Sequence, residues 1–162
     1  MSSPRPHMAV WKRLLLVLAI VFAMGACGLG YSLYQTVHVK IPESYAAWTT
    51  GNLMVEYFAT HTNQWPRGWE DLRSATNSLL EKGGHVWVPL DRLPQSVKVQ
   101  WHTDTDRLFQ AARSNSKVRI HLITRLDGSP LWAVWGTDTE PNTKVMGYLR
   151  WSLTTSNTGS SQ

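Results

Sequence analysis

The stretch that decides the architecture is Leu14–Tyr34, LLLVLAIVFAMGACGLGYSLY, which carries no charge over 21 consecutive residues. Lys12 and Arg13 directly precede it. A helix rises about 1.5 Å per residue and the hydrocarbon core of a bilayer is about 30 Å thick, so roughly 20 apolar residues are needed to cross it. The sequence therefore predicts a transmembrane helix over 14–34, with the lipid bilayer as a partner.

The charges on either side of this stretch predict its orientation. Arg5, Lys12 and Arg13 precede it, whereas Lys40 follows it and is offset by Glu43. The positive-inside rule then predicts a cytoplasmic N-terminus and an extracytoplasmic C-terminal domain in a single-pass protein of the cell membrane. The expected organisation is a cytoplasmic N-terminus 1–13, a transmembrane helix 14–34, a linker 35–43, an extracytoplasmic domain 44–153 and a disordered tail 154–162.

Two other interpretations of the N-terminal segment share this orientation. Ala23-Met24-Gly25 could serve as the cleavage site of a removed signal peptide, and Met24–Cys27 loosely matches a lipobox that would make Cys27 the lipidated N-terminus of an envelope lipoprotein. The apolar core of a signal peptide usually ends after 7 to 15 residues, whereas here it continues to Tyr34. The length therefore favours an uncleaved anchor.

Small residues recur every four positions in the span, at Ala19, Ala23 and Cys27. Such a stripe lets helix backbones approach closely, so it is a candidate face for self-association. Because Cys27 is the only cysteine, the exported domain contains no disulfide.

The charge balance argues against nucleic acid as a partner. The net charge is +5, but residues 41–153 hold 12 Lys or Arg against 11 Asp or Glu, a balance of +1. The remaining cations flank the membrane segment, so the domain lacks the concentrated basic footprint that nucleic-acid binding needs.

The sequence after the membrane segment predicts an α+β domain, with two helices followed by a small antiparallel sheet. Helices are expected over Ser44–Thr60, Trp69–Lys82 and, from Asp104 as a cap, a short one through Ala112. Strands are expected over 85–89, 97–103 and 117–126, the last turning at Asp127-Gly128 into a hairpin with 131–136. The period of 142–153 suits either a helix or a strand, and slightly favours a helix. Eight of the nine tryptophans lie in this domain, where core packing is the favoured role.

Two groups of residues are candidate binding sites. Alternation along 117–126 places Lys117, Arg119, His121 and Arg125 on one strand face, which could attract anionic headgroups or simply face solvent. His102, Asp104 and Asp106 could ligate a metal if the segment were extended, but Asp104 also suits a helix cap. With no further ligand at a suitable spacing, no metal and no cofactor are expected.

The chain contains no Gly-x-Ser-x-Gly, His-Glu-x-x-His, phosphate-loop or Gly-x-Gly-x-x-Gly motif. Scattered histidines form no catalytic signature in the sequence: His61, His85, His102 and His121. The sequence therefore predicts a non-catalytic binding or assembly domain whose partners are other envelope proteins. A small envelope hydrolase is a more distant alternative.

The segment Trp65–Leu72, WPRGWEDL, resembles a WPxxWxDL turn and helix found in uncharacterised membrane-anchored bacterial proteins, over about Tyr45–Leu72. This family has no assigned activity, so the resemblance implies an architecture only. The layout also resembles type II secretion pseudopilins, but these carry an acid soon after the prepilin cleavage site. Here the first acid after Gly25 is Glu43, so the likeness is architectural.

Overall fold

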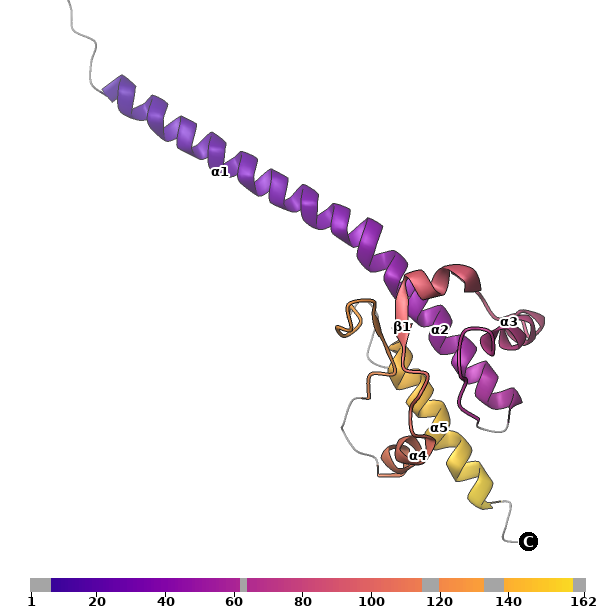
Figure 1. The fold of residues 1–162 in the computed structure, drawn as a ribbon. Coiled ribbons are helices and arrows are strands. Elements are labelled where there is room, and N and C mark those ends of the chain that lie inside the picture. The colour runs from indigo at the N-terminus through magenta and orange to yellow at the C-terminus, as the bar shows by residue number, and fades with distance from the viewer. Residues whose placement is uncertain (1–6, 62–63, 115–119, 133–138, 159–162) are drawn as a thin grey trace, which may run out of the picture. The chain divides into compact units, whose positions relative to one another are not determined.

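The computed structural model describes residues 7–61, 64–114, 120–132 and 139–158. The chain divides into two compact units, Met1–Val39 and Lys40–Gln162 (Figure 1). The described helices and strands are, in chain order, α1 (His7–Gln35), the π-helical η1 (Thr36–Lys40), α2 (Ile41–Thr60), α3 (Leu72–Glu81), the 3-10 helix η2 (Leu90–Gln95), β1 (Val97–Val99), α4 (Thr105–Arg113), β2 (Ile123–Arg125) and α5 (Pro141–Thr158). This mostly helical structure with one small antiparallel sheet confirms the α+β class.

The first unit consists mainly of α1, whose 29 residues correspond to a length of about 43 Å. Of the twenty large apolar side chains that are exposed in the described part of the chain, sixteen lie between Val10 and Val37. By length and composition, this is the one described helix able to cross a membrane. The uncharged run thus gives a long helix whose apolar surface is not covered by protein within its unit.

Helix α2 is the central element of the second unit. It packs against α3 and α5 and also contacts η2 and both strands (Figure 1). From Ala46 to Phe58 all its residues except Trp48 and Val55 are buried, so it is surrounded by protein on nearly all sides. Where α5 begins, a Cβ at Gly51 would lie only 3.1 Å from Cβ of Pro141. A glycine at this position lets the two helices approach closely.

The two strands form an antiparallel pair in which Val97 faces Arg125 and Val99 faces Ile123. On the other side of β2, the buried side chain of Asn142 accepts from the N–H of Ile123 at 2.7 Å and donates to its carbonyl at 3.0 Å. A side chain therefore takes the place of a third strand and satisfies backbone groups that would otherwise be unpaired. At the same end of α5, Glu140 accepts hydrogen bonds from Thr143.

The WPRGWEDL segment joins the end of α2 to α3 and to the turn after β1. The Trp65 indole N–H donates to the carbonyl of Gln100 at 3.2 Å, and its ring lies 5.3 Å from that of Phe58. Trp69 meets Trp101 edge to face, with ring centroids 4.9 Å apart. Each of these contacts is a packing contact, so the motif serves the fold of the second unit.

The expected helices are found with shifted ends. The first begins at Ile41, and residues 35–40 before it are also helical, although 35–43 was expected to be a linker. The second begins at Leu72, because Trp69–Asp71 form a turn. Asp104 caps α4 by accepting from the N–H groups of Asp106 and Arg107, as predicted. The helical alternative for 142–153 is confirmed, and α5 continues to Thr158.

The strand predictions were less accurate. Residues 85–89 contain no strand, and the strand expected over 97–103 ends at Val99. In place of strict alternation, Leu122, Ile123 and Thr124 are all buried and Leu126 is 51% exposed. The turn at Asp127-Gly128 is present, with φ of +81° at Gly128, but β2 pairs with β1, and Leu131 and Trp132 are not in a strand. The rest of the expected hairpin, 133–136, lies outside the described residues.

The tryptophans surround the core and do not form it. Among the described ones none is fully buried, and Trp87 and Trp151 are 51% and 60% exposed. Trp65, Trp69 and Trp101 pack partly buried against a core of mostly aliphatic residues with Tyr57 and Phe58. Trp135 lies outside the described part. The preference for core packing is therefore correct only in part, because large indoles with a polar N–H suit the edge of a small core.

Candidate functional site

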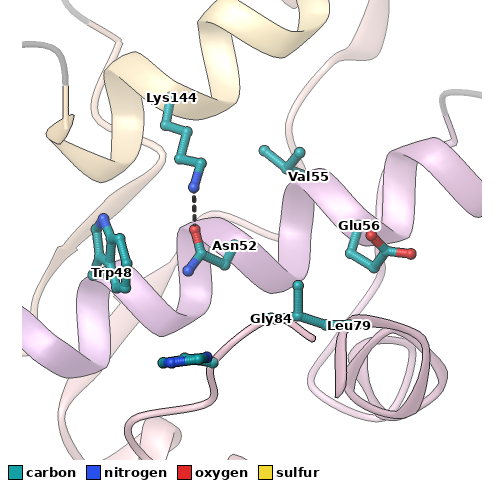
Figure 2. A pocket seen from close by; sticks show the side chains of 8 residues that line it. Trp48, Asn52, Val55, Glu56, Leu79, Gly84 and Lys144 are labelled. Carbon is teal, nitrogen blue, oxygen red and sulfur yellow. Dashed lines mark hydrogen bonds between the residues drawn. The ribbon is translucent and has the colours of Figure 1, made fainter. Parts of the chain in front are cut away.

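A pocket of about 330 Å³ opens between α2, α5 and the loop that follows α3 (Figure 2). Its walls come from four residues of α2, from the end of α3 and the loop after it, and from α5. This size is at the lower end of the range for small-molecule sites. The lining residues are Trp48, Asn52, Val55, Glu56, Leu79, Gly84, His85 and Lys144.

Lys144 brings an ammonium group to this pocket. Figure 2 shows its side chain reaching from α5 to Asn52 on α2, whose side-chain oxygen accepts a hydrogen bond from Nζ. Nζ also lies 5.3 Å from the centre of the Trp48 ring. Desolvation by burial lowers the pKa of Lys144. Among the described residues no carboxylate lies within ion-pair distance of it, so its partners here are a neutral amide and an indole.

Glu56, by contrast, is a buried carboxylate with its charge compensated. Its Oε1 accepts from Ser78 Oγ and from Lys82 Nζ, both at 2.6 Å. Burial acts to raise the pKa of Glu56, but the hydrogen bonds from Lys82 and Ser78 and the charge of Lys82 outweigh it, so the pKa is lowered. Glu56 therefore stays ionised as one partner of an ion pair between α2 and the end of α3.

The end of α3 places His85 at the pocket. The N–H of Gly83 bonds to the carbonyl of Leu80 and that of Gly84 to Leu79, at 3.0 and 2.9 Å, as in a Schellman motif with φ of +75° at Gly83. A Cβ on Gly84 would lie 2.4 Å from Leu79 Cδ1, so only glycine fits there. The chain then leads to His85 and to Trp87, whose ring lies beside both His85 and Trp48.

The pocket offers binding groups more readily than catalytic ones. Of the four histidines considered from the sequence, one lines it, and the adjacent carboxylate is already bonded to Ser78 and Lys82. His61 stacks on Tyr57 with ring centroids 4.0 Å apart, while His102 and His121 are exposed elsewhere. The described residues contain no cluster of three or more His, Cys, Asp or Glu able to hold a metal.

The residues predicted as an anion-binding face are placed differently. Lys117 and Arg119 lie outside the described residues, and His121 is exposed. Arg125 is engaged by two carboxylates, with Nε 3.1 Å from Glu43 Oε2 and a second nitrogen 3.2 Å from Asp127 Oδ2. Its charge is thus compensated within the second unit.

The predicted membrane-segment residues are all on α1. Ala19, Ala23 and Cys27 lie on its exposed surface, and Cys27, well away from either end of the helix, has a free thiol. The described structure contains one chain, so their roles in self-association and lipidation stay predictions.

Sequence reasoning missed the pocket. A possible signal was the polar Asn52 directly before the apolar run Leu53–Val55 of α2. Lys144 could not be linked to Asn52, because 92 residues separate them and the pairing of α2 with α5 is a tertiary contact.

No family of known proteins, no curated protein and no solved structure matches this chain. The resemblance of WPRGWEDL to membrane-anchored bacterial proteins is therefore untested by these comparisons, and function must be argued from the structure.

Proposed function

We propose that this chain is a single-pass membrane protein with a cytoplasmic N-terminus and an extracytoplasmic domain that binds or assembles with envelope partners and is not catalytic. The observation that carries the proposal is the exposed apolar surface of α1 from Val10 to Val37. A helix with this surface is stable in a lipid bilayer, where every backbone polar group is satisfied within the helix.

The second unit supports a binding role. It is a small packed domain with a pocket whose walls combine apolar side chains with Asn52 and Lys144. Its histidines and carboxylates are engaged or dispersed in the described structure, which favours binding over hydrolysis.

Topology can be tested with introduced cysteines, because Cys27 is the only cysteine of the chain and one substitution removes it. In a Cys27→Ser background, Ser3→Cys and Ser160→Cys each place one thiol near an end of the chain. A membrane-impermeant maleimide added to intact cells should label Ser160→Cys, whereas Ser3→Cys should require permeabilisation. The reverse pattern would overturn the orientation, and labelling of both only after lysis would overturn export.

The intact mass of the protein purified from the same membranes distinguishes the anchor from the lipoprotein alternative. For an uncleaved anchor, the mass should correspond to the full chain, with or without the initiator Met. A mass that corresponds to a chain beginning at a lipid-bearing Cys27 would refute the transmembrane anchor in favour of a lipoprotein. In that case Cys27→Ala should abolish the processing. Cleavage near Gly25 without lipid would indicate a removed signal peptide.

A further inference from the structure

Lys144 is the starting point, because its environment in the described structure is incomplete for a charged group. A partly buried ammonium normally has a carboxylate partner, since desolvation is costly unless a charge or several hydrogen bonds compensate it. Here the groups in contact are Asn52 Oδ1 and the Trp48 ring. An ammonium group has three donors, and Asn52 accepts from one of them.

The rest of the pocket leaves a net positive charge for a ligand. The Glu56 carboxylate is compensated by Lys82 at 2.6 Å, so the charge of Lys144 is left over. Glu56 lies one turn after Asn52 on α2, and its Oε1 bonds to Ser78 and Lys82 at the end of α3.

The walls next to Lys144 are apolar and include the aromatic ring of Trp48. Trp48, Val55 and Leu79 line the cavity, and Trp87 continues the aromatic surface with its ring 6.4 Å from Trp48 and 5.5 Å from His85. Aromatic rings of a ligand stack favourably on such surfaces.

From this juxtaposition we infer that the pocket binds a small organic acid, with its carboxylate on Lys144 Nζ and a compact apolar or aromatic body between Trp48, Leu79 and His85. The inference deepens the proposed binding role and rests on it. A hydrogen bond from a carboxylate at this position would give the ammonium a second acceptor and compensate its charge. The cavity of about 330 Å³ admits a single ring with a short acidic side chain.

The test uses a matched pair of probes, 3-phenylpropionate and its uncharged amide, titrated calorimetrically into the full chain in lipid nanodiscs, with empty nanodiscs subtracted. The acid should bind at least about tenfold more tightly than the amide, as expected for a hydrogen bond to a charged group. Equal affinities, or no saturable binding of the acid at millimolar concentration, would overturn the inference.

Two lysine variants identify the group responsible. Lys144→Met keeps the aliphatic stem and should abolish the preference for the acid, whereas Lys82→Met should retain it, because Lys82 pairs with Glu56. If Lys144→Met does not fold, as judged by circular dichroism, Lys144→Gln serves in its place. A preference that survives either folded Lys144 variant contradicts the assignment.

This outcome is separable from the topology experiment. If the acid does not bind but the maleimide labelling is as expected, the ligand inference fails and the proposed membrane topology stands. If the labelling pattern is reversed but the acid still binds more tightly than the amide, the pocket lies on the cytoplasmic side and the ligand inference stands.

Discussion

The indole N–H of Trp132 donates a hydrogen bond of 2.7 Å to Oε2 of Glu43, in the first turn of α2. The same oxygen accepts from Arg125 Nε, and the Arg125 guanidinium carbon lies 4.1 Å from the centre of the Trp132 ring. Lys40 Nζ lies 5.0 Å from that ring. The beginning of the second unit is thus held to the segment after β2 by a hydrogen-bonded ionic cluster.

Trp132→Phe should destabilise the second unit by about 1.5 kcal/mol, because a hydrogen bond to a partly buried carboxylate is lost while the ring is largely kept. The measurement is urea unfolding of the detergent-solubilised chain followed by circular dichroism. Trp87→Phe is the control, since this half-exposed indole N–H makes no hydrogen bond within the described structure. Equal midpoints for the two variants would show that the Glu43 contact contributes nothing.

Asn142→Ala should cost about 3 kcal/mol, because it leaves both the N–H and the carbonyl of Ile123 without their partner in a buried position. Hydrogen exchange at the Ile123 amide should also accelerate relative to wild type. Asn77→Ala, on the exposed side of α3, should leave stability near or above that of wild type. A loss below about 1 kcal/mol for Asn142→Ala would mean that water replaces the side chain.

Thr49 and Thr50 are both fully buried on α2, but only one of them is satisfied. Thr50 Oγ1 donates to the carbonyl of Ala46 at 2.8 Å, whereas Thr49 Oγ1 has no partner among the described residues. Thr49→Val should therefore raise the free energy of unfolding by up to about 1 kcal/mol relative to Thr50→Val, since it removes an uncompensated buried hydroxyl. Thermal denaturation of the two isosteric variants measures the difference, and the opposite order would refute this account.

Stability should fall in acid partly through Glu56. Its pKa is lowered in the folded state from an ordinary value of 4.5, so its contribution is present above that value and is lost as the pH falls through the lower, folded-state pKa. Glu56→Gln should make the decline of the unfolding free energy below about pH 4.5 less steep. Glu70 has a lowered pKa through Arg73 on the exposed surface, so Glu70→Gln should change the slope less. Identical slopes for wild type and Glu56→Gln would contradict the prediction.

The elements that could be predicted from sequence are those whose signal is local. The uncharged run predicted α1, and Asp104 as a cap predicted the start of α4. The strands were less predictable because burial on both sides of Ile123 comes from α2 and from the Asn142 side chain. Arg125 was expected on a strand face that binds anions or faces solvent, but its partners are Glu43 and Asp127, and Glu43 is 82 residues away. The pocket was missed for the same reason, because Lys144 and Asn52 meet only after α5 has packed on α2.

The packing of α2 against α5 also determines when the second unit can form. Ribosomes deliver α2 well before α5, the packing partner that begins at Pro141 beside Gly51. During synthesis the face of α2 that α5 covers therefore stays exposed until Pro141 and the rest of α5 have emerged. Nascent chains that stop before Pro141 should be protease-sensitive and should need chaperones.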